Sequence, residues 1–174
     1  IFALDAGIDV INKLKENFNK KNITNIKPIN SSIKNSNFKS NFFDHIIMYA
    51  VIHYLDNILE VENCIKELIR VCKPGGSILI AEIPEINAIR ELNEKKLTKE
   101  EIKILEEFNN NRSDYDNFMN KLIEYKGSKR NNELDGNELV QIANKYGCYA
   151  ELLKQDIRQP FSLSRRDLLI KLPK

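Results

Sequence analysis

The stretch from Phe42 to Pro84 constrains the fold of this chain more than any other part of the sequence. It opens on a short apolar run that ends at Tyr49, and a run so short and so rich in β-branched and aromatic residues predicts a buried strand. Apolar residues then recur at spacings of three and four, which predicts the buried face of an α-helix with Asp56 as its N-cap. These residues are Ile58, Val61, Ile65, Leu68, Ile69 and Cys72.

The same stretch closes with a turn and a second strand. Pro74 disfavours helical geometry at Lys73 and so ends the predicted helix. Gly75 and Gly76 accept the positive φ angles of a tight turn, and the apolar run 77–83 predicts a second buried strand. A strand, a helix and a strand with short connections predict a right-handed βαβ unit in a mostly parallel sheet.

The order of these motifs resembles the middle of a class I, S-adenosylmethionine-dependent methyltransferase. In that family an FD strand is followed by a segment like VIHYL, then by a helix that ends in R-hydrophobic-x-KPGG and by an apolar strand. Here FDHIIMYAVIHYL and, further on, IRVCKPGGSILIAEIP match that order. The resemblance implies an α/β, Rossmann-like fold with a mostly parallel sheet and an antiparallel last strand, and S-adenosylmethionine as the cofactor.

The composition is that of one ordinary domain. A length of 174 residues suffices for a single core, and a net charge of +2 gives no reason to expect a nucleic-acid partner. No apolar run approaches the ~20 residues that cross a membrane, and two histidines alone build no metal site. The three cysteines form no CxxC pair and are expected to be reduced core thiols, which predicts a cytoplasmic location.

Asp5 is the candidate ligand for the ribose of the cofactor. It ends a short apolar run and precedes a turn at Ala6 and an amphipathic helix that begins at Ile8. A carboxylate at the end of such a strand accepts hydrogen bonds from both ribose hydroxyls, and class I methyltransferases use the end of their second strand in this way. The resemblance therefore implies cofactor contacts at Asp5 and Ala6. The alternative is that Asp5 only caps the helix.

The chain begins at Ile1, without methionine and inside a predicted strand, so we expect the sequence to be an N-terminally truncated fragment. In dinucleotide-binding folds the glycine-rich loop lies ~20 residues before the ribose acid, but only four residues precede Asp5. The family's strand order is 3-2-1-4-5-7-6. The resemblance therefore implies that the first strand is missing from residues 1–174, which leaves a gap between the second and fourth strands.

Two serines follow the predicted third strand. In the family an acidic residue at this place often contacts the adenine amino group, but Asn30-Ser31-Ser32-Ile33 stands there instead. A serine hydroxyl still offers a hydrogen bond, although not a charge-assisted one. We therefore expect Ser31 and Ser32 to contact the cofactor, with a plain turn between a strand and a loop as the alternative.

Three further candidates follow strands whose carboxyl ends bind ligands in open α/β sheets. Tyr49 is expected to pack on the cofactor, or else to be a core aromatic. His53 is a candidate general base or a residue that orients the substrate, because the unperturbed pKa of histidine lies near neutrality, and the alternative is a packing or capping role. Glu82 is a candidate substrate contact, with a solvated strand end as the alternative.

Residues 86–130 are an expected insertion before the fold resumes. Two capping boxes, beginning at Thr98 and Ser113, each precede apolar residues at helical spacing, which predicts two amphipathic helices. The resemblance implies that this insertion lies above the cofactor cleft as a lid or substrate wall. A peripheral helix pair and a contact in a homodimer are the alternatives.

The end of the chain predicts one more helix and two strands. Asp135 is expected to cap a helix that stops at Gly147. The runs 148–153 and 167–172 predict strands, and so short a connection makes them antiparallel neighbours. The family ends in such a pair, so we expect residues 1–174, with the insertion, to form a single methyltransferase-like domain.

The function that the resemblance implies is methyl transfer to an oxygen, nitrogen or carbon atom of a small-molecule acceptor. Because the methyl donor is already activated, the main task of the protein is to hold donor and acceptor in line. Family members accordingly share no fixed catalytic residue. The alternative is a non-catalytic remnant or binding module that keeps the fold. An NAD-binding domain would share the ribose acid, but the KPGG turn and the terminal strand pair argue against it.

Overall fold

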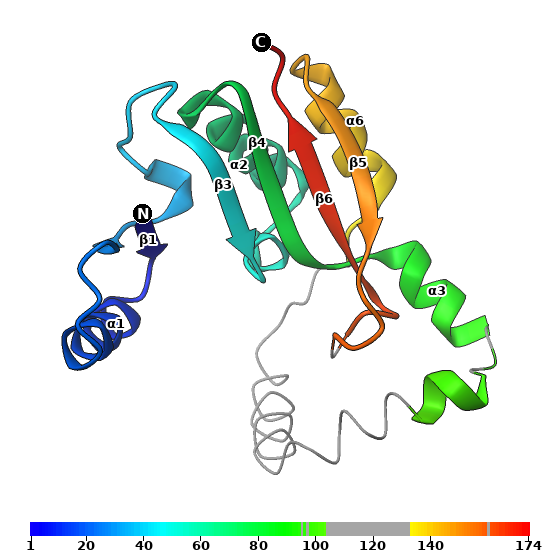
Figure 1. Cartoon of the computed structure of the whole chain (residues 1–174). Helices are drawn as coiled ribbons and strands as arrows, with labels where there is room; N and C mark the ends of the chain where they lie inside the picture. Colours follow the sequence, from blue (N-terminus) through cyan, green and yellow to red (C-terminus); the bar gives the residue numbers. More distant parts are fainter. Residues whose placement is uncertain (95, 97, 104–132, 160) are drawn as a thin grey trace. The chain divides into compact units, whose positions relative to one another are not determined.

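The computed structural model describes residues 1–94, 96, 98–103, 133–159 and 161–174. The chain forms two compact units, Ile1–Lys39 and Ser40–Lys174. The helices and strands of both units are drawn in Figure 1.

The first unit is a strand, a helix and a strand. β1 (Phe2–Asp5) and β2 (Lys27–Asn30) pair in parallel, and α1 (Ile8–Lys20) connects them. Asp5 lies opposite Asn30 in the register, so the carboxyl ends of the two strands meet. A short 3-10 helix, η1 (Ile33–Asn35), follows. The predicted strand at the start of the chain and the helix after it are confirmed.

The second unit is a four-stranded sheet with helices. Its strands run in the order β3-β4-β6-β5, where β3 and β4 are parallel and β6 is antiparallel to both of its neighbours. Helices α2 and α6 pack on one face of this sheet (Figure 1). The elements are β3 (Phe43–Tyr49), the 3-10 helix η2 (Ile52–Tyr54), α2 (Ile58–Val71), β4 (Cys72–Pro84), α3 (Ile86–Glu94), α6 (Gly136–Lys145), β5 (Tyr149–Lys154) and β6 (Arg165–Lys171).

The core of the second unit lies between the sheet and the two helices. In the middle of β4 and β6 alternate residues are completely buried, namely Ile78, Ile80, Leu168 and Ile170, as expected for strands with one covered face. Of the predicted buried face of α2, Val61, Ile65 and Leu68 are buried, whereas Ile58 is exposed and Cys72 belongs to β4. The predicted inward residues of α6 are buried. The fully buried aliphatic side chains of this core include Ile65, Leu68, Ile78, Ile80, Leu139, Leu168 and Ile170.

The KPGG motif differs in detail from its predicted turn. β4 begins at Cys72 and runs through the motif, with a register shift between Phe43 and His45 on β3. Gly75 has a φ of 74°, as expected, but Gly76 does not have a positive φ. A glycine is required at position 76 for a different reason, which is the closeness of the neighbouring backbone. A Cβ at this position would lie 2.5 Å from the Asp44 carbonyl oxygen.

The starts of the helices follow ordinary capping chemistry. The cap of α2 is Asn57, which accepts a hydrogen bond from the Glu60 amide at 3.0 Å, and not Asp56 as predicted. Asp135 caps α6 as predicted. The capping box at Thr98 is present, because its hydroxyl accepts from the Glu101 amide. The box at Ser113 lies outside the described residues.

The terminal strand pair is confirmed, with limits that differ by one or two residues from the prediction. β5 and β6 pair antiparallel from Tyr149 opposite Lys171 to Lys154 opposite Arg166. Gly147 has a φ of 78° after the end of α6, as its predicted stop requires. α3 was not predicted, since the expected insertion began without a recognised cap.

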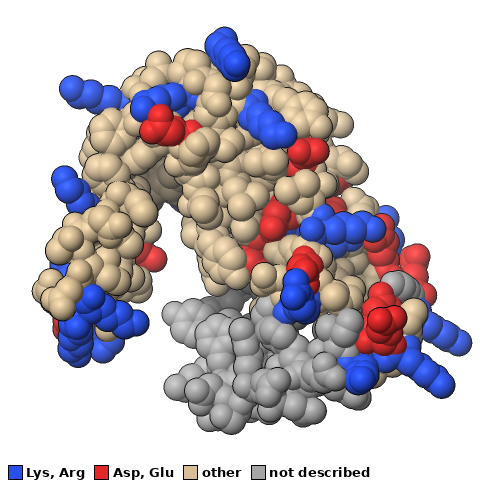
Figure 2. Space-filling model, viewed as in Figure 1, with Lys and Arg blue, Asp and Glu red and all other residues tan. Residues whose placement is uncertain are grey.

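The surface and the cysteines agree with the composition. In the second unit, Lys and Arg side chains lie interspersed with Asp and Glu over the face shown in Figure 2. All three cysteines are buried and free. None of the helices in the described residues is long and apolar enough to cross a membrane. The same residues contain no group of three or more His, Cys, Asp or Glu that could hold a metal ion.

The close approach at Gly76 predicts a large cost for a methyl group there. Gly76→Ala is expected to lower the free energy of unfolding by about 3 kcal/mol, because two backbone oxygens block the new Cβ. Gly75→Ala is the matched control and should cost about 1 kcal/mol, since only its positive φ is strained. Urea denaturation measures both losses. A smaller loss in Gly76→Ala than in Gly75→Ala would contradict the assignment.

Candidate cofactor and acceptor site

Asp5 ends β1 with an exposed carboxylate. One of its oxygens, Oδ1, accepts a hydrogen bond from the Gly7 amide at 2.7 Å, which holds the turn into α1. Gly7 itself is the N-cap residue of that helix. None of the described residues forms a hydrogen bond with the second oxygen, Oδ2. Asp5 therefore orders the turn with one oxygen and can accept hydrogen bonds from a ligand with the other.

The predicted cofactor residues of the first unit lie together at the carboxyl ends of β1 and β2. The Ser31 amide donates to the Asp5 carbonyl oxygen at 3.0 Å. The Asn30 side chain donates to the carbonyl oxygens of Asp5 and Ala6, at 3.1 and 2.9 Å. The Ser32 hydroxyl accepts from the Lys34 amide and caps η1. This polar cluster is a suitable place for the ribose and the adenine of a nucleoside.

Tyr49, His53 and Glu82 belong to the second unit. Tyr49 ends β3, and its side chain is 61% exposed, so the alternative of a core aromatic is wrong. Ala50 follows it with a φ of 53°, an uncommon conformation for a residue with a Cβ. The chain turns sharply here, at the carboxyl end of a parallel strand, where open α/β sheets bind ligands.

His53 lies in η2 and is only 4% exposed. Its ring lies beside that of Tyr54, and none of the described residues forms a hydrogen bond with its Nδ1 atom. Burial, together with the positive charge of Arg165, lowers the pKa of His53 to about 4. The imidazole is therefore neutral at neutral pH and a weak base, which disfavours a role in general-base catalysis.

Glu82 sits near the end of β4 in a strained conformation. Its φ is 63° and its side chain is buried, so the alternative of a solvated strand end is wrong. A non-glycine residue in this region costs about 1–3 kcal/mol and persists where surrounding contacts hold it. Here the Asp167 carboxylate accepts from the Glu82 amide at 3.0 Å, and Gln155 donates to both carboxylates, at 3.2 and 2.7 Å.

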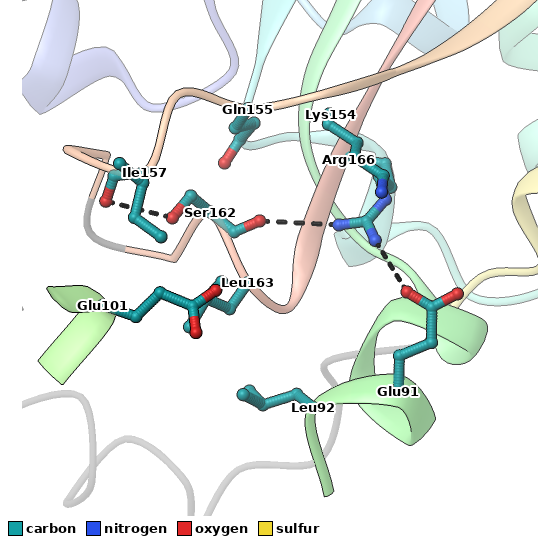
Figure 3. Close-up of a pocket in the computed structure, with 9 residues that line it drawn as sticks. All are labelled: Glu91, Leu92, Glu101, Lys154, Gln155, Ile157, Ser162, Leu163 and Arg166. Carbon is teal, nitrogen blue, oxygen red and sulfur yellow. Dashed lines mark hydrogen bonds and ion pairs between the residues drawn. The ribbon is translucent and has the colours of Figure 1, made fainter. Parts of the chain in front are cut away.

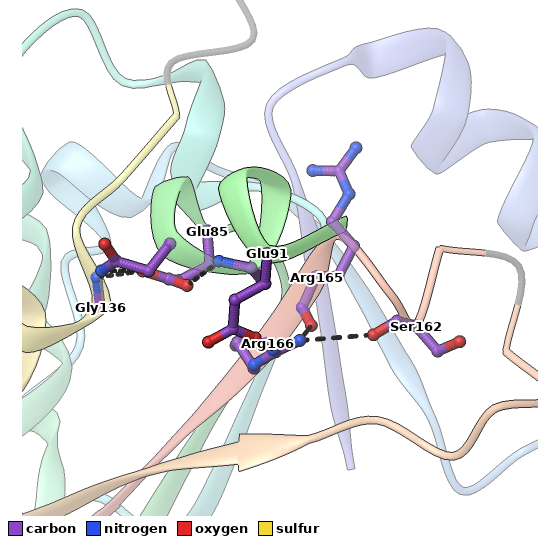
Figure 4. Close-up of polar contacts among 8 residues, drawn as sticks. Glu85, Glu91, Gly136, Ser162, Arg165 and Arg166 are labelled. Atoms are coloured by element: carbon purple, nitrogen blue, oxygen red, sulfur yellow. Dashed lines mark hydrogen bonds and ion pairs between the residues drawn. The ribbon is translucent and has the colours of Figure 1, made fainter. Parts of the chain in front are cut away.

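Arg165 supplies the positive charge of this cluster. Its guanidinium donates to the Glu82 carbonyl oxygen at 3.5 Å and lies over the Phe161 ring. Burial lowers the pKa of Arg165, and the charges of Glu82 and Tyr54 act in the opposite direction. Figure 4 shows Arg165 and its neighbour Arg166 pointing in opposite directions from β6. The positive charge of Arg165 acts on His53 and Glu82.

Glu85 closes the base of the insertion. Its carboxylate is buried and accepts from the Ala88 amide at 2.7 Å, which caps α3, and from the Gly136 amide at 3.2 Å, which starts α6 (Figure 4). The backbones on the two sides also pair, since the Leu134 amide donates to the Pro84 carbonyl oxygen. The chain thus leaves the sheet and returns to it at the same point, which agrees with an insertion between β4 and α6.

Sequence reasoning did not find four residues of this region, namely Asn30, Gln155, Arg165 and Asp167. Asn30 was quoted only as part of the serine turn. The other three lie in or beside the terminal strand pair, more than 70 residues from Glu82. One signal in the sequence could have indicated these three residues. Asp167 is a charged residue in an otherwise apolar predicted strand.

Comparison with protein families agrees with the motifs. Residues 1–80 match the family model described as a methyltransferase domain. This range contains the candidate ribose acid, the two serines and the KPGG motif. No curated protein sequence matches the chain significantly.

Solved structures share the fold over nearly the whole chain. PH0226 protein from Pyrococcus horikoshii is 19% identical with a TM-score of 0.67, and the alignment covers 100% of this chain and 71% of that one. A SAM-dependent methyltransferase from Aquifex aeolicus is 16% identical with a TM-score of 0.58, over 98% and 68% of the two chains. The N-methyltransferase NodS from Bradyrhizobium japonicum, in complex with S-adenosylhomocysteine, is 12% identical with a TM-score of 0.56, over 99% and 66%.

These findings confirm the predicted resemblance to class I S-adenosylmethionine-dependent methyltransferases. The family model supports it over residues 1–80, and the structures confirm the Rossmann-like α/β fold. The expected cofactor, S-adenosylmethionine, agrees with both. The individual roles of Asp5, His53 and Glu82 stay predictions.

The buried His53 predicts a loss of stability on mild acidification. The unfolded chain binds a proton below about pH 6.5, whereas the folded protein resists it until about pH 4. Stability should therefore fall by about 2 kcal/mol between about pH 7 and about pH 5, as measured by urea denaturation. His53→Gln should lose most of this dependence, whereas the exposed control His45→Gln should retain it. An equal pH dependence in His53→Gln and wild type would contradict the assignment.

Proposed function

We propose that this protein transfers the methyl group of S-adenosylmethionine to a small-molecule acceptor. The observation that carries the proposal is the exposed carboxylate of Asp5, at the carboxyl end of a parallel strand and inside the range that matches a methyltransferase domain. The oxygen that Gly7 does not engage offers the acceptor that a ribose diol requires.

The residues around Asp5 fit a nucleoside. Asp5 would accept hydrogen bonds from the ribose, with the Ala6 backbone beside it. Ser31 and Ser32 follow the neighbouring strand and would contact the adenine with their hydroxyl or backbone groups. Tyr49 offers an exposed aromatic ring at the end of β3 for packing against the cofactor.

The protein's part in the reaction is mainly positioning. When bound, the cofactor would supply an activated methyl group: the lone pair of the acceptor would form a bond to the methyl carbon while the carbon–sulfur bond breaks, and the thioether S-adenosylhomocysteine would leave. A neutral His53 with a pKa near 4 removes a proton poorly at neutral pH. We therefore propose that His53 orients the acceptor and that a proton lost by the acceptor passes to solvent.

We propose that the groups that contact the acceptor belong to the second unit. Glu82 is held in its strained conformation by Asp167, Gln155 and Arg165, which is the kind of stored strain that collects at functional sites. The insertion begins directly after β4, because Glu85 fixes its base. We propose that the insertion is a wall or lid that selects the acceptor.

Removal of the Asp5 charge tests the cofactor site. Asp5→Asn keeps an oxygen for the Gly7 amide but loses the charge, so it should weaken S-adenosylhomocysteine binding about tenfold in isothermal titration calorimetry. Asp5→Ala should weaken binding further. Asp9→Asn removes another exposed acid of the same unit and should leave the affinity unchanged. Full-length wild-type protein that binds no S-adenosylhomocysteine would exclude the proposed function.

A further inference from the structure

Arg165 is the first residue of β6 and lies opposite Pro84, at the carboxyl end of β4. Its side chain is half-buried, and its guanidinium lies over the Phe161 ring. A guanidinium carries five N–H donors in a fixed plane. Among the described residues the guanidinium has one hydrogen-bond acceptor, the Glu82 carbonyl oxygen at 3.5 Å. Arg165 therefore offers unused donors at the edge where open α/β sheets bind ligands.

Two arginines close to Arg165 in the chain have carboxylate partners. Arg158, in the connection between β5 and β6, pairs with Asp156 at 2.7 Å. Arg166 pairs with Glu91 at 3.3 Å in the lining of a pocket of about 230 Å³ (Figure 3). Arg165 forms no ion pair with any of the described residues. Partial burial of a charge without a partner costs free energy, which an anionic ligand would offset.

The guanidinium of Arg165 is accessible to a ligand. Of the described residues, only His53 and Gln155 have a buried side-chain nitrogen or oxygen atom without a hydrogen bond. The nitrogen atoms of Arg165 that lack an acceptor therefore reach solvent. Figure 4 shows the guanidinium at the end of a side chain that points away from Arg166 and Ser162.

Two carboxylates of the same cluster are held by other donors. Asp167 accepts from the Glu82 amide at 3.0 Å and from Gln155 at 2.7 Å. The Glu82 carboxylate accepts from Gln155 at 3.2 Å. The charge of Glu82 acts on Arg165, but the two side chains form no ion pair. A ligand anion in direct contact with the guanidinium gains more from it than it loses to acids at a longer distance.

Tyr54 offers a second donor near Arg165. Its side chain is 62% exposed, and its ring lies beside that of His53 with the centroids 4.4 Å apart. The charges of Tyr54 and Arg165 are close enough to interact. None of the described residues forms a hydrogen bond with the Tyr54 hydroxyl group. A phenolic hydroxyl and a guanidinium together suit a group with several acceptor oxygens.

We propose that the methyl acceptor carries an anionic oxygen group, a carboxylate or a phosphate, which Arg165 binds while Tyr54 donates a further hydrogen bond. The planar fork of a guanidinium matches two oxygens of such a group, and charge-assisted hydrogen bonds are roughly twice as strong as neutral ones. The inference rests on the proposed methyl transfer. It makes Arg165 the residue that selects acidic acceptors.

The position of Arg165 relates this contact to the reaction. Tyr54 follows β3, and Arg165 lies opposite the last residue of β4, so both belong to the carboxyl edge of the parallel strands. Tyr49, which we propose to pack on the cofactor, ends β3 at the same edge. An acceptor bound by its anionic group would therefore extend along this edge toward the cofactor.

Three probes test the charge preference. Benzoate and phenyl phosphate each carry an anionic oxygen group on a benzene ring, and benzamide is the uncharged match of benzoate. In NMR titrations of the full-length protein near neutral pH, at least one anion should bind about tenfold more tightly than benzamide. A preference for benzoate indicates a carboxylate on the acceptor, and a preference for phenyl phosphate indicates a phosphate. Benzamide that binds as tightly as both anions would overturn the proposal.

Three variants assign the preference to Arg165. Arg165→Gln should bind the anions no more tightly than benzamide, whereas Arg165→Lys keeps the charge without the planar fork and should retain a reduced preference. Arg158→Gln removes an arginine that already has a carboxylate partner, and it should bind all three probes as the wild type does. Thermal unfolding checks that each variant is folded. A folded Arg165→Gln that still prefers the anions would refute the assignment.

His53 reports the bound anion independently of affinity. Burial and the charge of Arg165 lower the pKa of His53 to about 4. An anion on Arg165 offsets that charge and adds little burial to a ring that is already buried, so phenyl phosphate should raise the pKa of His53. In Arg165→Gln this pKa should be higher from the start and should not respond. Imidazole signals in an NMR pH titration measure both, with exposed His45 as the internal control. An unchanged pKa of His53 at saturating phenyl phosphate would contradict binding at Arg165.

The cofactor site is measured separately on the same samples. S-Adenosylhomocysteine affinity should be the same in Arg165→Gln and wild type, because the candidate ribose ligand lies in the first unit. Full-length wild-type protein without S-adenosylhomocysteine binding defeats the proposed function. Protein that binds S-adenosylhomocysteine but does not distinguish the anions from benzamide defeats only the proposed role of Arg165.

Discussion

The second unit depends on the hydrogen bonding of β4 along both of its edges. β4 pairs in parallel with β3 and antiparallel with β6, so its backbone groups pair on both sides, while α2 packs against its side chains. A strand held in this way cannot shift its register without exposing its apolar face. Its carboxyl end is therefore a fixed point, and the candidate acceptor residues gather around it.

Two buried carboxylates near that end have different tasks. Glu85 is satisfied by backbone amides of α3 and α6 and so anchors the insertion to the sheet. Glu82 is held in a left-handed conformation by side chains from the terminal strand pair, and Gln155 extends this cluster to the lining of the pocket. A structural anchor and a strained candidate site thus lie three residues apart, and their partners, not their residue type, distinguish them.

Local patterns predicted most of the architecture. Apolar spacing indicated α2 and the strands, and Asp135 and Gly147 marked the limits of α6, because such signals depend on neighbouring residues in the chain. The local patterns missed what a distant group decides. The positive φ predicted at Gly76 was wrong, because this glycine is required by the Asp44 carbonyl oxygen on another strand. The lowered pKa of His53 comes from its burial and from the charge of Arg165. Neither cause is visible in a local pattern.

The sequence by itself determined the class of fold and the candidate ribose acid, because motif order, strand-end position and helical periodicity are properties of the linear chain. The resemblance to methyltransferases rested on those motifs, and the family match and the shared fold agree with it. Only the tertiary structure placed Gln155 and Asp167 beside Glu82. These residues are distant in the chain, and their hydrogen bonds exist only once β4 and β6 have paired.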